Sequence, residues 1–333
     1  MAYYDFNYVT GPVWDIVEGR PKLFKRSYEL YIGKPVPVRK TYGPNDTVLI
    51  DNYIDKKPGP NTFLIKDNHI TFSCKKDVES EPNKATISIY NPDPNIIEYV
   101  ENFSTLKLSC IFRAGYGGDN VELFRGTIES YEVDTSSPDI IFKLKVADGK
   151  NNLTEAQSNR FYPAGTSYSK IIKDLSQDLG LPLGVAINQQ GASKKPLYFA
   201  GKSSLNILHL SRLLKADFSV QNGAIWYFPE NSRLREEVYK ITPSSGLLFD
   251  VEPYSRNGEE TANDKASVAK QIRFSALLNG YLLPNKTVYV ESSGDKPKYK
   301  GYYKIIECKH SGGYESTSPW VTEVIAREAG NII

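Results

Sequence analysis

The segment AGYGGDNVELFRG, residues 114–126, places three glycines and an Asp-Asn pair between two apolar runs. A phosphate-binding loop needs G-x-G-x-x-G or G-x-x-x-x-G-K-[ST] and a following helix, whose free N–H groups hold the phosphate. Here Gly115, Gly117 and Gly118 lead into Asp119-Asn120 and then into another strand-like run. Glycine and Asn or Asp are the residues that a tight turn with positive φ requires. The segment therefore predicts the tip of a β-hairpin, not a nucleotide-binding loop.

Alternating apolar residues on both sides of this turn predict a β-rich unit over residues 63–150. Ile70, Phe72 and Cys74 alternate, and similar runs follow in KATISIYN, LKLSCIF, VELFRGTIESYEV and DIIFKLKVAD. Such alternation is typical of half-buried strands. NIIEYVENF predicts one short helix, which needs a sheet to pack on. The 23 Tyr and 14 Phe residues against a single Met also favour strands over packed helices.

Residues 151–238 show a helical pattern and predict a small α+β insert. SYSKIIKDLSQDLG has serines before an apolar helical face and Gly180 after it. SSLNILHLSRLLKA predicts a second helix, with Leu205, Leu208 and Leu213 on its apolar face. Asn222-Gly223, between two alternating apolar runs, predicts a hairpin. The residues expected on the first helical face are Ile171, Ile172, Leu175 and Leu179.

Ser167 and Lys170 fit the S-x-x-K pattern of serine acyltransferases at the start of the first helix. That chemistry also needs partners such as S-D-N and K-T-G. The NKTV run at Asn285 lacks the glycine, and no S-D-N occurs. We therefore interpret Ser167 as a helix cap and Lys170 as an exposed first-turn residue. The sequence predicts no catalytic residue.

Residues 239–333 return to strand-like runs after a polar stretch. FRGTIESYEV, from Phe124, and YKGYYKIIEC, from Tyr299, share an aromatic residue, a basic residue, a glycine and a later Glu-apolar pair. Gly-Asp precedes both segments and Ser-Pro follows both. This similarity suggests two copies of one β module separated by the insert.

Charge and residue content argue against several kinds of function. The 41 Lys and Arg nearly balance the 39 Asp and Glu, so no global basic field favours nucleic acid or anionic membranes. The histidines and cysteines lack the spacing of metal ligands. We expect no metal and no cofactor, and we expect the cysteines to be free and buried. The residues concerned are His69, His209, His310, Cys74, Cys110 and Cys308.

No stretch approaches the ~18 apolar residues of a membrane span. The start, MAYYDFNYVTGPVWDIVEG, lacks the basic and apolar regions of a secretory signal, so we expect folding in a cytoplasm. Residues 1–62 are dense in Tyr, Pro and Gly and predict an N-terminal arm, or loops around a few strands. The expected organisation is an arm at 1–62, a β domain at 63–150, the insert at 151–238 and a second β domain at 239–333.

Two parts of the chain carry ordered series of motifs. Residues 85–133 contain ISIYN, a short helical run, AGY and LFRGTI. Residues 277–328 contain LLNGYLLPN, then HSGG and WVT. These series resemble the first and second tube domains of central baseplate hub proteins from contractile-tailed bacteriophages. Pro284-Asn285 stands where that family has P-G, and Gly312-Gly313 stands where it has G-D; the resemblance covers roughly residues 63–328.

The resemblance implies a mainly β fold in which two similar tube-type domains, barrels or sandwiches, flank a two-helix-plus-hairpin insert. Family members are trimers whose six β domains form a ring that adapts a sixfold tail tube to a threefold spike. The implied partners are two further copies of the chain, a separate spike protein, the tail tube protein, the tape measure protein and surrounding baseplate proteins. DNA would only pass through the channel, without sequence-specific contacts. No membrane is among the implied partners. The implied location is the virion tail baseplate, after assembly in the host cytoplasm.

Two alternatives stay open from the residues alone. A tail-associated peptidoglycan hydrolase would need a pair of carboxylates, which a chain with this many acidic residues can supply. A carbohydrate-binding adhesion module would use some of the many aromatic residues. No motif places two carboxylates together, so a structural, non-enzymatic role is favoured.

Overall fold

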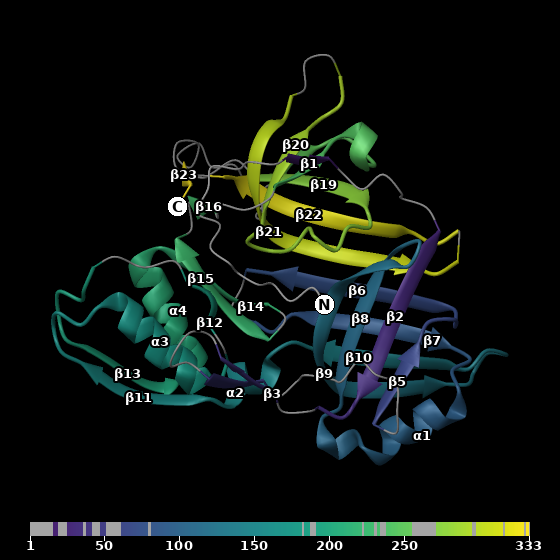
Figure 1. The fold of residues 1–333 in the computed structure, drawn as a ribbon, viewed down its shortest axis with the longest axis horizontal. Coiled ribbons are helices and arrows are strands. Elements are labelled where there is room, and N and C mark those ends of the chain that lie inside the picture. Colours follow the sequence, from purple (N-terminus) through teal and green to yellow (C-terminus); the bar gives the residue numbers. More distant parts are fainter. Residues whose placement is uncertain are drawn as a thin grey trace.

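The protein is described here by a computed structural model in which strands dominate. Figure 1 shows a first β unit in purple to teal, a second β unit in green to yellow, and a smaller unit that carries most of the helices, called the insert below. The fold is mainly β with a small α-containing insert, as expected. The structure describes residues 16–18, 25–35, 38–41, 47–50, 61–78, 81–181, 183–186, 191–221, 223–229, 232–233, 238–254, 271–294, 298–315, 317–329 and 331–332.

The first β unit is an antiparallel sheet with the strand order β5-β2-β8-β9-β10-β7-β6. The predicted alternation is confirmed, since Ile70, Phe72 and Cys74 are all buried. Its strands are β2 (Arg26–Gly33), β5 (Thr62–Ile65), β6 (Ile70–Asp77), β7 (Lys84–Tyr90), β8 (Ser109–Tyr116), β9 (Asp119–Asp134) and β10 (Ile141–Ala147).

The sheet curls so that strands far apart in its order share one core. The rings of Phe72 on β6 and Phe112 on β8 lie 4.7 Å apart, although three strands separate β6 from β8 in the sheet. The Tyr28 hydroxyl on β2 donates to the Asn68 backbone oxygen at 2.6 Å, beside the start of β6. The predicted short helix is α1 (Pro94–Asn102), followed by the 3-10 turn η1 (Ser104–Leu106). It packs on the sheet through three buried residues, Ile96, Tyr99 and Val100.

Strand β2 falls within residues 1–62, and the structure corrects their assignment to an arm. β2 lies between β8 and β5 as an inner strand of the first β unit. Tyr28, Leu30 and Ile32 alternate and are buried, so a strand pattern was present in a region dense in Tyr, Pro and Gly. Apart from three short strands, the rest of the predicted arm lies mainly outside the described residues. These strands are β1 (Ile16–Glu18), β3 (Val38–Thr41) and β4 (Thr47–Ile50), of which β3 and β4 pair with each other.

The glycine-rich segment forms the predicted hairpin. β8 and β9 pair with Tyr116 opposite Asp119, which leaves Gly117 and Gly118 as a two-residue loop. Their φ angles of 62° and 87° are both in the left-handed region. Two consecutive positive φ angles are characteristic of the type I′ turn, whose twist matches that of the strands. The next element is a strand and not a helix, so no helix N-terminus is present to hold a phosphate.

Gly117→Val and Gly118→Val are each expected to lower the free energy of unfolding by about 1–2 kcal/mol. An added Cβ would meet no atom within 4 Å at either glycine, so the cost is backbone strain and not a collision. Denaturant unfolding measures this change. Gly118→Asn is the control and should cost clearly less, because asparagine tolerates the left-handed conformation. Unfolding of both valine variants like the parent would contradict the assigned turn.

The second β unit has its own sheet order and its own core. Its order is β18-β19-β22-β21-β20-β17, with β1 beyond β17, and only the β17–β20 and β1–β17 pairs are parallel. Phe274, Val288 and Ile305 lie in its buried cluster. Its elements are β17 (Val238–Ile241), the 3-10 turn η2 (Pro243–Ser245), β18 (Glu252–Pro253), β19 (Gln271–Leu277), β20 (Thr287–Glu291), β21 (Lys300–Gly313) and β22 (Trp320–Glu328).

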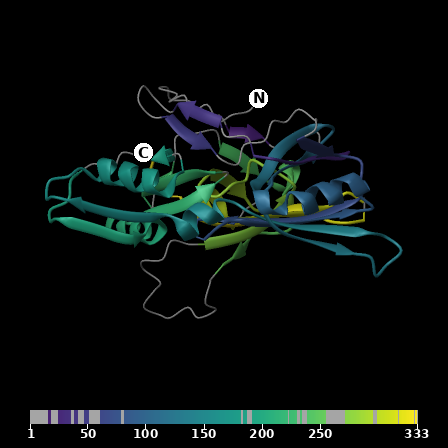
Figure 2. The same cartoon turned by 90° about the horizontal axis from the view of Figure 1, so that it is seen from below.

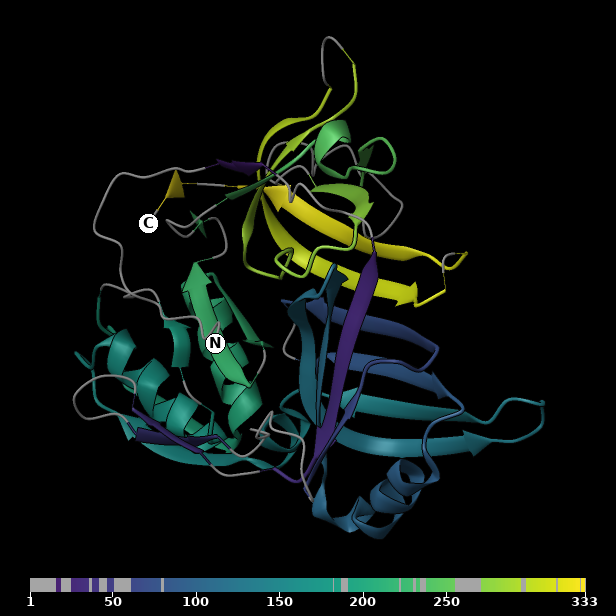
Figure 3. The ribbon, with the colours of Figure 1, turned by 45° about the vertical axis from the view of Figure 1, so that its right-hand side comes forward.

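Strands β6 and β21 join the two β units into one continuous sheet. They pair antiparallel from Asp77 opposite Glu307 to Thr71 opposite Gly313, and Figures 1 and 3 show the units meeting edge to edge there. Because β6 uses its outer edge for this contact, the path of paired strands stays open. Within the described residues neither unit closes into the ring of strands that a barrel requires.

The two β units repeat one order of four strands. β7-β10-β9-β8 in the first unit corresponds to β19-β22-β21-β20 in the second, with four consecutive chain segments in each. In both units the third segment bulges against the fourth, at Glu129 and at Ile306. The similar segments FRGTIESYEV and YKGYYKIIEC lie on these equivalent strands, β9 and β21. The bulge follows Gly126 by three residues but follows Gly301 by five. The sequence similarity therefore identified the equivalent strands, but its alignment of the two glycines is shifted by two residues from the structural alignment of the two bulges.

The insert contains both predicted helices and the predicted hairpin. Ser167 caps the first helix by accepting from the backbone N–H of Lys170, and Gly180 ends it at a φ of 68°. Figure 2 shows the insert extending from one side of the molecule and the β9–β10 hairpin projecting from the other. The elements are α2 (Lys150–Glu155), β11 (Gln157–Tyr162), α3 (Tyr168–Leu179), β12 (Leu183–Ala186), β13 (Leu197–Lys202), α4 (Ser203–Leu214), β14 (Ala216–Gln221) and β15 (Ala224–Pro229), and the short pair β16 (Ser232–Arg233) and β23 (Asn331–Ile332) follows.

The prediction of which face of α4 is buried is wrong. Leu205 and Leu213 are 59% and 53% exposed, whereas Ile207 and Leu210 are buried. The Ser204 hydroxyl donates to the Leu153 backbone oxygen at 2.7 Å on the packed side. Small serines allow α4 to approach its neighbours closely and bond to them, so leucine spacing alone did not identify the buried face. The polar residues on that face are Ser203, Ser204, Asn206 and Ser211.

Candidate functional surfaces

Strand β14 is buried on both faces, although only one of them is apolar. Phe218 and Val220 enter the core of the insert. Asp217, Ser219 and Gln221 alternate with them, and all three are buried. Because neighbouring side chains of a strand point to opposite faces, these three share the face that meets the β units. We call the polar contacts that Asp217, Ser219 and Gln221 make on this face, described below, the β14 seam.

Asp217 is shared by two cations of the second β unit. Nζ of Lys304 on β21 lies 2.6 Å from Oδ2 of Asp217, and Nη2 of Arg327 on β22 contacts the same oxygen. The Lys304 side chain is 1% exposed. Buried charges persist only with such partners, since their desolvation costs several kcal/mol. Farther along β14, Nδ2 of Asn285 donates to Oγ of Ser219 at 3.1 Å.

The far end of β14 contacts the first β unit. Nδ2 of Asn83 donates to the Val220 backbone oxygen at 2.7 Å and to Oε1 of Gln221 at 3.1 Å. Nε2 of Gln221 donates to the Asp77 backbone oxygen at 2.7 Å. The backbone N–H of Gly223 donates to Oδ1 of Asp148 at 2.9 Å. The β14 seam therefore bonds the insert to both β units.

The junction of β6 and β21 encloses two thiols and an imidazole. Cys74 lies opposite His310, and both are fully buried, as is Cys308. Nδ1 of His310 lies 2.9 Å from Oγ1 of Thr322. Burial, and secondarily the charge of Lys76, lowers the pKa of His310 to about 3. Burial raises the pKa of Cys74 and of Cys308 to about 12, so these thiols stay protonated and are not nucleophiles.

The structure confirms that the cysteines are free and buried, including Cys110. In the described part of the chain, no group of three or more His, Cys, Asp and Glu side chains is placed to hold a metal ion. His209 lies on the exposed side of α4, and Nδ1 of His69 lies 3.6 Å from a carboxylate oxygen of Glu315. Nor does any helix within the described ranges have the length and apolar character needed to cross a membrane.

Ser167 and Lys170 occupy the structural roles that the sequence predicted for them. Oγ of Ser167 accepts from the Lys170 backbone N–H as the cap of α3. Nζ of Lys170 lies 3.2 Å from Oδ2 of Asp174, one turn along the helix. The serine oxygen is engaged in the cap and the ammonium in an ion pair, which does not match a serine nucleophile activated by a lysine base.

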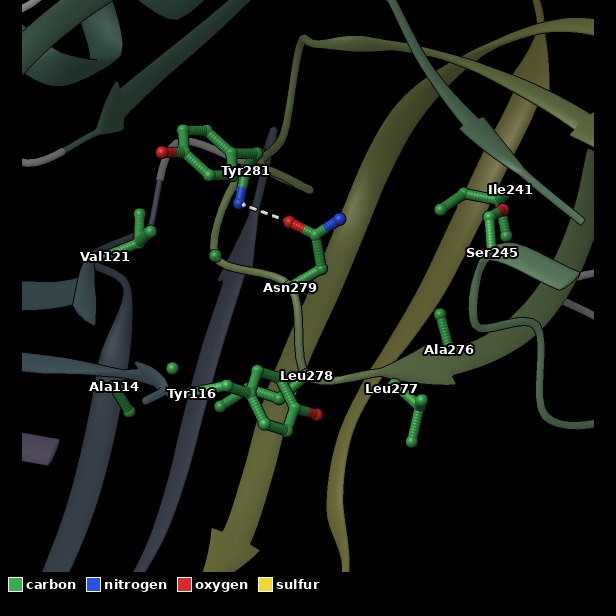
Figure 4. A pocket seen from close by; sticks show the side chains of 12 residues that line it. Ala114, Tyr116, Val121, Ile241, Ser245, Ala276, Leu277, Leu278, Asn279 and Tyr281 are labelled. Carbon is green, nitrogen blue, oxygen red and sulfur yellow. Dashed lines mark hydrogen bonds between the residues drawn. The ribbon is translucent and has the colours of Figure 1, made fainter. Parts of the chain in front are cut away.

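A small pocket lies where the β8–β9 hairpin meets the segment after β19 (Figure 4). Its volume is about 20 Å³, against the roughly 10–15 Å³ that one water molecule needs and the ~300–1,000 Å³ of ligand sites. Oδ1 of Asn279 accepts from the Tyr281 backbone N–H at 3.0 Å and orders the segment. Tyr116 of the first β unit and Leu278 of the second both line it. It is a packing gap between the β units and has no room for a substrate.

A larger, open groove runs along the insert between β11 and α3, with a volume of about 560 Å³. Beside it, Phe161 on β11 and Tyr198 on β13 are cross-strand neighbours, 66% and 67% exposed. Neighbouring exposed apolar side chains that form a patch, unlike single ones, often mark contact sites. The groove is lined by Asn159, Arg160, Phe161, Tyr162, Pro163, Thr166, Ser167, Lys170 and Asp174.

Known proteins resemble this chain in fold but not measurably in sequence. No family model and no curated protein matches the sequence. The 43 kDa tail protein of prophage MuSo2 from Shewanella oneidensis matches with a TM-score of 0.55 at 9% identity, over 80% of this chain and 94% of that one. The tail protein from Neisseria meningitidis MC58 matches with a TM-score of 0.55 at 9% identity, over 92% of this chain and 97% of that one.

An E. coli component of the type VI secretion system also matches, with a TM-score of 0.52 at 13% identity, over 79% of this chain and 74% of that one. That protein is described as structurally similar to the T4 bacteriophage tail proteins gp27 and gp5. The mainly β fold with a small α-containing insert, which the motif series at residues 85–133 and 277–328 implied, is thereby confirmed. This chain has the fold of phage tail proteins and of a type VI secretion component that resembles them.

Proposed function

We propose that this chain is a structural protein of a bacteriophage tail baseplate and acts there as the central hub. The observation that carries the proposal is the repeated strand order of the two β units within one chain. A ring of three chains, each with two similar β units, has six similar surfaces on the side of the tail tube. On the side of the spike it keeps threefold symmetry. A single gene product can thus join a sixfold tail tube to a threefold spike.

The proposed ring uses closed cyclic symmetry, which limits growth to a ring and prevents a fibre. Free sheet edges of each chain would pair with a neighbour, which satisfies backbone groups that an isolated sheet leaves exposed. In this arrangement residues 63–150, together with strand β2, and residues 239–333 are the two tube-type domains that complete barrels in the ring. The insert, residues 151–238, lies outside the ring.

The proposed partners follow from the same arrangement. Two further copies complete the ring, the tail tube protein and a separate spike protein bind its two faces, and the tape measure protein occupies its lumen. Other baseplate proteins surround it, and DNA passes through its channel without sequence-specific contacts. The proposed location is the virion tail baseplate, assembled in the host cytoplasm.

Size-exclusion chromatography with light scattering tests the hub directly. We expect a particle of about three times 37.4 kDa and, in negative-stain images, a threefold ring with six similar lobes. The same preparation should not lyse purified cell walls, because the proposed role is structural. A chain that stays monomeric even in assembled tails would contradict the hub proposal. Cell-wall lysis that a single Glu or Asp substitution abolishes would favour a peptidoglycan hydrolase instead.

A further inference from the structure

The groove of the insert follows the free edge of a strand. Within the described residues, β11 pairs with β13 only. A free strand edge carries backbone N–H and C=O groups that can pair with another chain. Five consecutive residues, 159–163, line the groove. Because neighbouring side chains of a strand point to opposite faces, consecutive lining residues mean that the backbone edge of β11 is itself one wall.

One face of α3 forms the opposite wall. Ser167, Lys170 and Asp174 line the groove at the three- and four-residue spacing of one helical face. Nζ of Lys170 pairs with Asp174, and Arg160 binds the Asp178 carboxylate through two hydrogen bonds of 2.8 and 2.6 Å. Since these charges already have partners, the groove favours an occupant without a strong charge.

Tyr162 places a buried hydroxyl beside the groove. Its side chain lines the groove while only 3% exposed, and the carboxylate of Asp174, which also lines the groove, is the acceptor beside its hydroxyl. Burial, and secondarily the negative charge of Asp174, raises the pKa of Tyr162, so the hydroxyl keeps its proton. The backbone carbonyl of an occupant would offer this hydroxyl an alternative acceptor in the groove.

We propose that this groove binds an extended, uncharged peptide segment of another protein as a third strand beside β11. Strand addition takes its affinity from main-chain hydrogen bonds and its specificity from pockets for alternate side chains. The volume of about 560 Å³ is within the range of ligand sites. Phe161 and Tyr198 share the outer face of the strand pair, where they would cover apolar side chains of the added strand.

A second copy of this chain fits the groove less well. A cyclic trimer has no twofold axis, so β11 cannot pair with the β11 of a neighbour in an isologous contact. The end strands of the main sheet, β5 and β1, have four and three residues, against six in β11. This comparison rests on the proposed trimer, whereas the groove and its free edge do not.

The test uses the full-length protein and linear peptides of about 12 residues, selected from a random displayed library. Lys170→Trp fills the helix wall of the groove, and Lys173→Trp, exposed on the same helix outside the groove, is the control. Selected peptides should bind the parent and Lys173→Trp alike, and Lys170→Trp at least about tenfold more weakly. N-methylation of alternate peptide amides should abolish binding, and bound peptide should slow hydrogen exchange at residues 157–162.

Tyr162→Phe separates a binding role from a purely structural one. Binding should weaken by about fivefold, while the unfolding temperature of the peptide-free protein should change only slightly, because the change removes one hydroxyl and leaves the packed ring in place. The proposal is overturned if no selected peptide is sensitive to Lys170→Trp, or if N-methylated peptides bind as well as the originals. Binding of soluble oligosaccharides in the groove in place of peptides would also overturn it.

The assembly state of each variant is measured separately. A Lys170→Trp protein that loses the parent's oligomeric state would show that the groove holds a second copy, and this too would overturn the proposal. A parent that is monomeric but binds peptides along β11 would instead count against the hub alone. The two proposals therefore fail through different observations.

Discussion

Asp217→Asn is expected to lower the free energy of unfolding by about 3–5 kcal/mol, because it removes the anion that two cations share in the β14 seam. Lys304, 1% exposed, would then be a buried cation without the Asp217 carboxylate, which raises its desolvation cost. Lys304→Met should cost less, because Asp217 would keep its contact with Arg327. Denaturant unfolding of each variant measures these differences.

A double-mutant cycle tests whether the effect belongs to the contact. Asp217→Asn combined with Lys304→Met should cost less than the sum of the single changes, with a coupling of about 1–3 kcal/mol. Glu307→Gln is the matched control, because Glu307 pairs with Lys75 across the β6–β21 junction at 3.1 Å, but with side chains that are 28% and 52% exposed. It should cost less than about 1 kcal/mol. Equal losses for Asp217→Asn and Glu307→Gln would show that the seam charges do not hold the insert.

His310 is expected to make the protein less stable in mild acid. Its pKa is about 3 in the folded protein, against about 6.5 in an unfolded chain. Between these values the unfolded chain binds a proton that the folded protein excludes, so the stability is complete above about pH 6.5 and is lost as the pH falls toward 3. At about 1.36 kcal/mol per pH unit, this loss is about 2 kcal/mol at pH 5 relative to pH 7.

The measurement compares slopes, since other groups also titrate in this range. His310→Asn can keep a hydrogen bond to Thr322 but has no proton to gain, so its unfolding free energy should fall less steeply between pH 7 and about pH 4.5. His209→Asn, at an exposed position on α4, is the control and should keep the parental slope. The comparison holds even if His310→Asn is less stable at every pH. Equal slopes for His310→Asn and the parent would refute the prediction.

Several elements could be predicted because their signals lie within a short window of sequence. The hairpin at Gly117-Gly118 needs residues that tolerate positive φ, and the structure shows both in that conformation. Helix α3 begins at a serine cap and ends at Gly180, each of which satisfies backbone groups locally. The same period-two alternation that predicted β6 and β7 is also present in β2, at Tyr28, Leu30 and Ile32, and could have identified that strand.

The candidate binding groove could be predicted only in part. Ser167 and Lys170 were singled out as a pattern, and their roles as cap and first-turn residue are confirmed. Their position opposite the free edge of β11 depends on how α3 packs over β11, which no short window of sequence contains. The sequence shows Tyr162 only as an ordinary strand tyrosine, and only the structure shows that its hydroxyl is buried beside the Asp174 carboxylate in the groove.

Strand β14 shows most clearly what the sequence determined and what the tertiary structure decided. The alternation of ADFSVQ determined a strand with Phe218 and Val220 on one face. The same alternation predicts that Asp217 and Gln221 face water. The structure buries that face, because Lys304, Arg327, Asn83 and Asn285 reach it from strands and loops far along the chain. Periodicity is a local property of the sequence. The partners that allow a polar face to be buried come from residues distant in the chain, so only the tertiary structure could assign this face to the interior.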